Sequence, residues 1–388
     1  MNAKIAVLAL ASVVSTTASA QSKPTFVPYG IADVSVGTQN TGFGYRPNVN
    51  SGGFYASRFG FKGEAPLADA VAAVYVAEGG LHFDLGDMGN STPAAGINNG
   101  NASSGGGNGT GPQLFARQMF AGIRTPAGSL LVGRQYAGSY LVAAGPATPW
   151  PGMYGSSATI LALNGMPTRV NNAAVYVSPT LAGLRVYLLG GTGSENNVDS
   201  TVASGTAFTN ARAGRIGEAT LFYSLGSLNL GASAWYVYNN TFVTGETDLA
   251  IKKGWQAAAN YDFFGYFTVY GTVTQGQITG GNYENVTKTL SKSVGWSGAL
   301  MIPYGNSRLA FNYTNLNDKS KLNKDGDLLG VMYWYKIKPQ TTVYTSAGWQ
   351  KNHGTATYSL TDAGSLVGTP AKLGSDARGF QVGFAQEF

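Results

Sequence analysis

Cysteine is absent from this chain, and histidine and charged residues are scarce. The 388 residues include no cysteine and two histidines, and charged residues make up 11% of them. Without cysteine the chain can form neither a disulfide framework nor a thiolate metal site. The two histidines, His82 and His353, leave little material for metal binding or acid–base catalysis. We therefore expect no cofactor and no metal, and the composition argues against an enzyme.

Long apolar runs are also missing. The mean hydropathy is −0.04, and no apolar run reaches the roughly 18 residues that a membrane-spanning helix requires. Glycine (55 residues), tyrosine (22) and phenylalanine (18) are abundant instead. A chain that is rich in glycine and aromatic residues, poor in charge and without helical spans is typical of a transmembrane β-barrel, in which alternate residues face lipid and lumen.

The first twenty residues have the plan of a cleaved secretory signal. Lys4 precedes an apolar run over residues 5–14, and the small-residue word "ASA" stands directly before Gln21. Such a run is too short to span a bilayer and, with a small-residue cleavage site, indicates export. We expect residues 1–20 to be a signal peptide and residues 21–388 to form a single domain.

The positive charge of the chain is spread along its length. The formal net charge is +6, but no cluster of Lys and Arg forms a stripe, which argues against a nucleic-acid partner. No segment repeats, and no Gly-rich stretch has the strand–turn–helix context of a phosphate-binding loop.

The C-terminal segment shows the clearest alternation in the chain. In "RGFQVGFAQEF", Phe380, Val382 and Phe384 share one face, whereas Gln381 and Ala385 share the other. A period of two, with aromatic residues on one face and small or polar residues on the other, is the pattern of a strand between lipid and lumen. A strand of a soluble sandwich would alternate in the same way, but the export signal favours the barrel.

Sixteen such segments follow one another, most of them of the roughly ten-residue length that a tilted strand needs to cross hydrocarbon. Short connections with turn residues, such as "TPAG", "LGS" and "PYGN", alternate with long connections rich in Gly, Asn and Ser. This alternation predicts an all-β fold, a transmembrane antiparallel β-barrel of 16 strands with both chain ends in the periplasm. The segments lie near residues 25–37, 53–64, 69–79, 114–124, 128–136, 169–178, 181–191, 215–225, 228–240, 251–263, 266–277, 291–302, 306–317, 327–337, 340–350 and 376–388.

A series of sequence words in register carries a family resemblance. They are "PYGIADVSVG", "SRFGFKGE", "VYVAEGG", "LFARQMFAGI", "VGRQY", "RVNNAAVYVSP" and the terminal Phe388. Together they resemble the Gram-negative trimeric porins, particularly the betaproteobacterial type. The resemblance implies an outer-membrane homotrimer that associates through the walls formed by its first strands. It also implies that the third external loop folds into the lumen as a constriction, and that Phe388 is the signal read by the barrel assembly machinery.

The resemblance further implies an arginine cluster on one wall of the constriction, facing carboxylates on the inward-folded loop. The matching words place the arginines at Arg58, Arg134 and Arg169. Alternation independently directs Arg58 and Arg169 into the lumen, with Lys62 on the face of Arg58. It fails for Arg134, because the preceding "LLV" is apolar on both faces. We interpret this as a wall strand covered outside by a neighbouring subunit and inside by a packed loop.

The expected constriction loop, residues 137–168, departs from the family pattern. No Asp or Glu occurs between positions 88 and 194, so this loop cannot supply the acidic half of a transverse field. We expect Trp150 and Tyr154 to narrow the pore by their bulk, and Glu78 to be the counter-charge of the arginines. Arginines that no acid cancels would favour anions. Arginines that only satisfy wall carboxylates and loop carbonyls would leave no net field.

The predicted function is that of an outer-membrane porin. Small hydrophilic solutes and ions would diffuse passively through a water-filled lumen with a preference for anions, and outer-membrane lipid would surround the barrel. Sixteen strands leave room for water, unlike the filled interior of a small barrel. A channel specific for phosphate or small carboxylates, a barrel enzyme and an adhesin stay open as alternatives.

Two further arginines, Arg117 and Arg124, are assigned to the rim, since they lie near the ends of their strand.

Overall fold

The computed structural model describes most of the chain outside the N-terminal segment and several loops. The described residues are 23–86, 88, 114–157, 165–193, 198–199, 208–209, 214–242, 249–283, 286–321, 323–361, 366–367 and 370–388. The expected signal peptide, residues 1–20, and positions 158–164 of the expected constriction loop lie outside this part.

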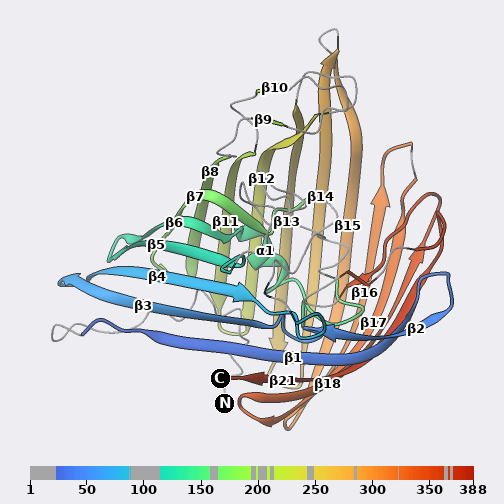
Figure 1. The fold of residues 1–388 in the computed structure, drawn as a ribbon, viewed down its shortest axis with the longest axis horizontal. Helices are drawn as coiled ribbons and strands as arrows, with labels where there is room; N and C mark the ends of the chain where they lie inside the picture. Colours follow the sequence, from blue (N-terminus) through green and yellow to red (C-terminus); the bar gives the residue numbers. More distant parts are fainter. Residues whose placement is uncertain are drawn as a thin grey trace.

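The described elements are β-strands and one short helix, and the long strands form a single antiparallel sheet (Figure 1). The elements are β1 (Val27–Asn40), β2 (Tyr45–Ser51), β3 (Arg58–Ala68), β4 (Val71–Gly80), β5 (Gln118–Thr125), β6 (Gly128–Tyr136), α1 (Gly138–Ala143), β7 (Arg169–Val177), β8 (Leu184–Thr192), β9 (Val198–Asp199), β10 (Phe208–Thr209), β11 (Arg215–Leu225), β12 (Leu228–Phe242), β13 (Leu249–Phe263), β14 (Phe267–Tyr283), β15 (Val286–Tyr304), β16 (Ser307–Asp318), β17 (Gly326–Lys338), β18 (Thr341–Asn352), β19 (Leu360–Thr361), β20 (Leu366–Val367) and β21 (Ala377–Glu387).

The sheet closes on itself between its first and last strands. β1 pairs with β21 over residues 31–40 and with β3 at its start. The strands of this sheet between β3 and β21 pair in chain order, with β8 next to β11 and β18 next to β21, because the short strands β9–β10 and β19–β20 form two separate small sheets. The last residue takes part in this closure, because Gly30 and Phe388 exchange backbone hydrogen bonds of 2.9 and 3.0 Å. A closed ring satisfies the backbone polar groups that an open edge would leave unpaired in hydrocarbon.

The ring has sixteen strand positions, as predicted, although the sheet contains 17 strands. The difference arises because β2 and β3 lie end to end on the same side of β1, where β2 pairs with residues 34–40 and β3 with residues 27–31. The predicted strand 53–64 is wrong in its first part, since residues 52–57 form a loop between β2 and β3. The sequence analysis did not predict β2, because its segment "YRPNVNS" contains proline and asparagine, which are rare in strands.

The predicted alternation of faces is confirmed along the wall strands. In β21, Phe380, Val382 and Phe384 are about half exposed, whereas Gln381 and Ala385 are buried. Aromatic side chains at the tight turns are exposed as well, including Phe264, Tyr266 and Tyr304. Large apolar side chains therefore point away from the lumen, with an aromatic girdle at one rim, as in a barrel surrounded by lipid.

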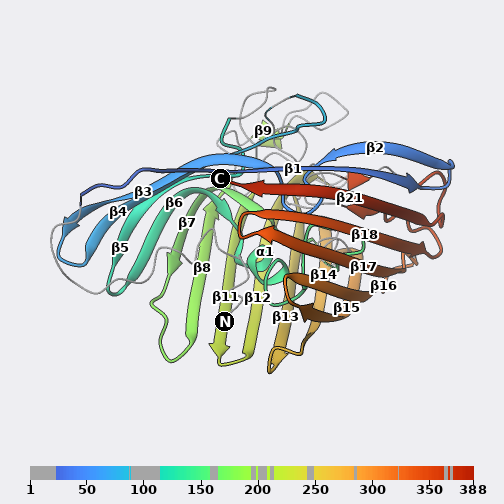
Figure 2. The same ribbon diagram turned by 90° about the horizontal axis from the view of Figure 1, so that it is seen from below.

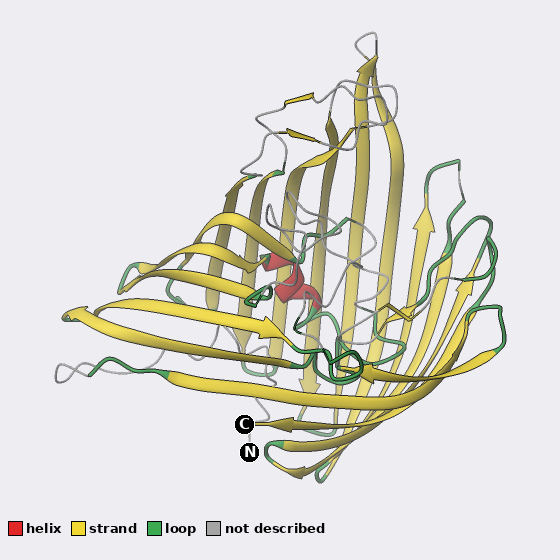
Figure 3. Cartoon of the chain, in the orientation of Figure 1, coloured by secondary structure: helices red, strands yellow, loops and turns green. Residues whose placement is uncertain are grey.

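The described part of the segment between β6 and β7, residues 137–157 and 165–168, lies inside the ring, as predicted, and α1 forms its start (Figures 2 and 3). Side chains of the far wall hold its backbone: Gln256 donates to the carbonyl of Ser139, and Thr272 donates to that of Ala147 at 3.2 Å. Asn312 donates to the carbonyl of Gly155 at 2.9 Å. The segment is thus bonded successively to β13, β14 and β16 and narrows the interior of the ring. No helix among the described residues is long and apolar enough to cross a membrane.

The segment approaches the wall closely at Gly155, and this approach depends on glycine. Gly155 has a positive φ of 84°, and its backbone lies against Gly330 of β17 and Gly348 of β18. A Cβ on Gly330 would lie 2.2 Å from the carbonyl oxygen of Gly155, a distance that no side chain can occupy. The segment reaches the wall here only because neither backbone carries a side chain.

Replacing Gly330 with valine will push the inward segment away from β17. Because the obstacle is a backbone carbonyl, we expect the free energy of unfolding in detergent to fall by about 1–3 kcal/mol, as for other overpacked sites. Gly298→Val is the matched control, since nothing lies within 4 Å of a Cβ at that position. Equal denaturant midpoints for the two variants would contradict this packing.

Candidate functional site

The predicted arginines lie on adjacent strands of one wall. Arg58 opens β3, Arg134 lies near the end of β6 and Arg169 opens β7. Register brings them together: residue 169 pairs with Tyr136, two positions beyond residue 134. Lys62 lies four residues further along β3 than Arg58, with its Nζ 5.5 Å from the centre of the Tyr29 ring. The structure therefore gathers all four basic residues on one part of the inner wall.

Glu78 provides the carboxylate of this wall. Its Oε1 accepts a hydrogen bond of 2.8 Å from Nε of Arg117, and its Oε2 lies 3.8 Å from Nη1 of Arg58. The Tyr29 hydroxyl donates to Oε2 at 3.0 Å. Glu78 is fully buried, so its charge is compensated by these partners instead of by water. The predicted contact between Glu78 and the arginines is present in the structure.

Arg117 is a member of the cluster that the sequence did not identify. It was predicted at the rim, but its side chain is 2% exposed and bridges Glu78 to Tyr136, whose hydroxyl it reaches at 2.6 Å. Alternation would have placed Arg117 on the outer face with Met119, but β5 begins only at residue 118. The preceding loop sets the direction of the side chain. Arg124 does lie at the turn end, paired with Glu64 at 2.7 Å.

Tyr136 joins two of the arginines. Its hydroxyl accepts hydrogen bonds from Nη2 of Arg117 at 2.6 Å and from Nη2 of Arg169 at 3.2 Å. The guanidinium carbon of Arg169 also lies 4.9 Å from the centre of the Tyr136 ring, a cation–π distance. Tyr140 of α1 also stacks on Tyr136, with ring centroids 4.9 Å apart. The aromatic pair holds positive charge in place without neutralising it.

A bulge in β6 explains why alternation failed at Arg134. The register with β7 shifts between Gly133 and Gln135, and Gly133 has a positive φ of 132°. A bulge of this kind re-aims the side chain that follows it. Arg134 is 9% exposed, donates to the carbonyl of Ala116 at 2.6 Å and bonds to the Asn171 side chain. Both of these partners are neutral, so neither compensates its charge as a direct ion pair would.

The two bulky residues of the inward segment, Trp150 and Tyr154, are buried, and their role in narrowing the pore by bulk stays a prediction. Trp150 stacks on Phe54 at a centroid distance of 3.9 Å and donates its indole N–H to the Phe54 carbonyl. The hydroxyl of the buried Tyr154 accepts a hydrogen bond of 3.0 Å from Asn50. Large rings gain more by burial against the wall than by contact with water. These side chains fasten the segment to the wall.

Two other buried carboxylates serve the scaffold. Asp33 accepts the backbone N–H groups of residues 53–55 and the hydroxyl of Tyr344, and so shapes the loop before β3. Glu218 accepts the backbone N–H and hydroxyl of Ser139 at the start of α1. The Asp33 carboxylate is therefore occupied by the loop backbone and the Tyr344 hydroxyl.

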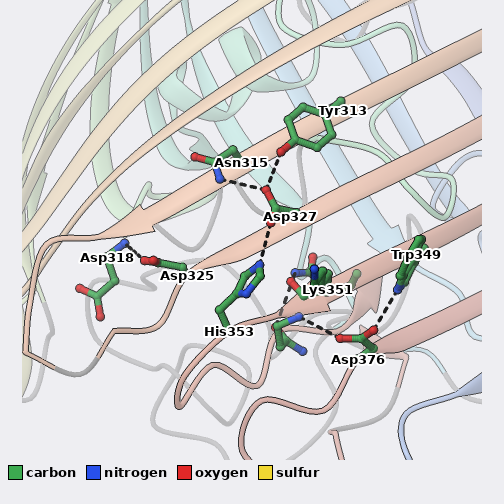
Figure 4. Close-up of polar contacts among 11 residues, drawn as sticks. Tyr313, Asn315, Asp318, Asp325, Asp327, Trp349, Lys351, His353 and Asp376 are labelled. Atoms are coloured by element: carbon green, nitrogen blue, oxygen red, sulfur yellow. Dashed lines mark hydrogen bonds and ion pairs between the residues drawn. The ribbon is translucent and has the colours of Figure 1, made fainter.

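His353 belongs to a polar cluster at the long-loop ends of β16–β18 (Figure 4). Its Nε2 lies 2.8 Å from Oδ2 of Asp327, and the other carboxylate oxygen accepts hydrogen bonds from Tyr313 and Asn315. These contacts fasten the loop after β18 to β17, a structural role for His353. Within the part of the chain that the structure describes, no group of three or more His, Asp or Glu side chains is placed to hold a metal ion.

Comparisons with known proteins agree with this architecture. A family model described as Gram-negative porin matches residues 6–355. An outer membrane porin protein of Bordetella pertussis is 24% identical over 389 residues, which cover 90% of this chain and 94% of that protein.

Solved porin structures share the fold at low sequence identity. The anion-selective porin from Comamonas acidovorans is 16% identical, with a TM-score of 0.69 over 94% of this chain and 100% of that one. OmpT of Vibrio cholerae, in its trimer form, is 17% identical, with a TM-score of 0.66 over 95% of this chain and 100% of that one. The family match covers most of the sequence, and the fold match covers nearly all of it. The chain therefore belongs to the Gram-negative porin family and is an outer-membrane porin, a channel for passive transport and not an enzyme.

Proposed function

We propose that this porin prefers anions and that the arginine wall is its filter. The observation that carries the proposal is an imbalance of charge: Arg58, Arg117, Arg134 and Arg169 cluster on this wall, and the carboxylate of Glu78 contacts two of them, Arg58 and Arg117. The segment that faces this wall contributes no Asp or Glu. In support, a protein of the same fold from Comamonas acidovorans is described as an anion-selective porin.

The physical basis of the filter is an uncancelled positive potential beside the narrowed water path. A unit charge about 4 Å from an ion contributes roughly 1 kcal/mol in bulk-like water, and more where water is partly excluded. Arg58 is the most accessible member, with a side chain that is 18% exposed, and is proposed to meet ions directly. Arg134 and Arg169 are more deeply buried and are proposed to add to the potential through the wall, with Lys62 extending it.

The size limit is proposed to follow from the fastened inward segment. Hydrogen bonds to β13, β14 and β16 hold its backbone across the lumen, and the buried rings of Trp150 and Tyr154 anchor its far end. A segment held at so many points narrows the path by a fixed amount. Solutes would then be sorted by size as well as by charge.

Assembly is proposed to follow the family pattern. The outer faces of β5 and β6 carry exposed apolar side chains, among them Met119, Leu130 and Val132, which a neighbouring subunit of a homotrimer would cover. The match to a trimer form of a fold relative supports this arrangement. The exposed ring of Phe388 ends the closing strand and is proposed as the signal for the barrel assembly machinery. The other proposed partners are outer-membrane lipid and small hydrophilic solutes and ions.

Removing two arginines together tests the filter. Arg58→Ser with Arg134→Ser should lower the anion preference several-fold and raise the conductance for larger solutes, because the wall loses charge and bulk. The measurement is the zero-current potential of the purified protein in a planar bilayer under a salt gradient at low ionic strength, where screening is weak.

The control for this experiment removes the same charge elsewhere. Arg308 bonds to turn carbonyls and Arg378 lies on the Trp349 ring at the outer face, so Arg308→Ser with Arg378→Ser should leave the potential unchanged. If the two double variants give the same ion selectivity, the arginine wall is not the filter.

Neutralising Glu78 should act in the opposite direction. Glu78→Gln removes the acid that offsets Arg58 and Arg117, so the anion preference should rise. The same change leaves buried positive charge unpaired, and we expect the free energy of unfolding to fall by about 3–5 kcal/mol. Glu64→Gln breaks the more exposed pair with Arg124 and should cost about 1 kcal/mol or less. An unchanged potential in the Glu78 variant would argue that the wall carries no net field.

A further inference from the structure

The loop between β2 and β3, residues 52–57, folds against the interior of the ring. Its Phe54 stacks on Trp150 of the inward segment at a centroid distance of 3.9 Å and on Tyr344, a buried side chain of β18, at 5.3 Å. Along residues 51–58, Tyr55 and Arg58 are partly exposed and the other residues are buried. Because the wall and the inward segment enclose this loop, the exposed parts of the two side chains face the water in the lumen.

The ring of Tyr55 has one face covered and one face uncovered. It lies at 80° to Phe54 and 72° to Trp150, with centroid distances of 4.8 and 4.9 Å. Since Phe54 and Trp150 are stacked on each other, a perpendicular ring this close to both must rest one face on their edges. Among the described residues, no third ring packs on Tyr55 and no cation stacks on it. The second face of the ring therefore accounts for the exposure of Tyr55.

The guanidinium of Arg58 lies beside this ring. Its Nε donates to the carbonyl of Ala56 at 2.8 Å, which folds the side chain back along the loop towards Tyr55. Its Nη1 lies 3.8 Å from Oε2 of Glu78, which is longer than a hydrogen bond. Neither Nη1 nor Nη2 donates a hydrogen bond to a described residue. The guanidinium thus keeps donors for a carboxylate, whose two oxygens match its geometry.

Two acids near this site limit the charge of a ligand. Glu78 is engaged by Arg117 and by the hydroxyl of Tyr29. The carboxylate of Glu387 lies near the hydroxyl of Tyr55. A ligand with a second negative charge would meet these acids, whereas a ligand with one carboxylate can direct it to Arg58. The site therefore combines one accessible cation with one flat apolar face.

We propose that Tyr55 and Arg58 form a binding site for aromatic monocarboxylates on their way through the pore. The carboxylate of the solute pairs with the Arg58 guanidinium, and its ring stacks on the uncovered face of Tyr55. The inference deepens the anion preference proposed above and rests on it, because Arg58 belongs to the same arginine wall. Stacking of two aromatic rings strengthens binding about twofold to tenfold beyond the effect of the buried area. A saturated ring of the same size and charge lacks this gain.

The test compares how two carboxylates block the chloride current of the purified protein in a planar bilayer. Benzoate and cyclohexanecarboxylate both carry one charge on a six-membered ring, but benzoate alone is aromatic. We expect benzoate to half-block the wild-type current at a concentration about twofold to tenfold lower than cyclohexanecarboxylate does.

Variants of Tyr55 locate the effect. Tyr55→Leu removes the aromatic face and should make the two half-blocking concentrations equal, whereas Tyr55→Phe keeps the face and should retain the difference. The matched control is Tyr236→Leu, which removes a tyrosine that is 39% exposed on the outer face of β12 and should also retain the difference. If Tyr55→Leu lacks folded mobility on unheated gels, Tyr55→Met takes its place.

The outcomes separate the aromatic site from the filter on which it rests. A benzoate preference that is lost in Tyr55→Leu and retained in Tyr55→Phe and Tyr236→Leu would support the site. Equal block by both carboxylates in the wild type, no block by either, or a preference that persists in Tyr55→Leu would overturn it. The zero-current potential in potassium chloride is measured in the same bilayers. Equal block together with an anion-selective potential would overturn the aromatic site alone, whereas a potential without anion selectivity would overturn the proposed filter.

Discussion

Closure of the sheet between β1 and β21 is the constraint on which the other features of this porin depend. Hydrocarbon offers no hydrogen bonds to an unpaired strand edge, so the first and last strands must meet. They do so through continuous pairing of residues 31–40 with the C-terminal strand, and Phe388 extends this pairing to Gly30. Once the ring is closed, every strand has one face to lipid and one to the interior, and the interior is wide enough to admit a chain segment.

The inward segment supplies hydrogen-bond acceptors for polar side chains on the inner face of the ring. Gln256, Thr272 and Asn312 would face water in an empty lumen, but here they donate to carbonyls of the segment. The segment brings no carboxylate to the opposite wall. Among the described residues, the arginines there contact neutral groups, such as the Tyr136 hydroxyl and the Asn171 side chain, and the acid Glu78. A buried arginine can make such hydrogen bonds without an anion beside it, because hydrogen-bond acceptors need not be charged.

Much of the fold could be predicted because a barrel strand is specified locally. The period of two, the tight turns at "TPAG" and "PYGN", and the exposed aromatic face of β21 follow from residues that are neighbours in sequence. The strand β2 escaped prediction since its word "YRPNVNS" lacks the β-branched and aromatic residues of a strand over most of its length. It is stabilised by pairing with β1, a contact that no local pattern reports.

The sequence by itself determined the barrel, the faces of its strands and the absence of acid from the inward segment, because these depend on residue type and alternation. Only the tertiary structure decided the direction of individual side chains where the alternation breaks. The bulge at Gly133 changes the direction of the Arg134 side chain. The loop before β5 places Arg117 in contact with Glu78, and Trp150 stacks on Phe54. Each of these outcomes depends on partners that are distant in sequence, and their positions exist only once the ring has closed.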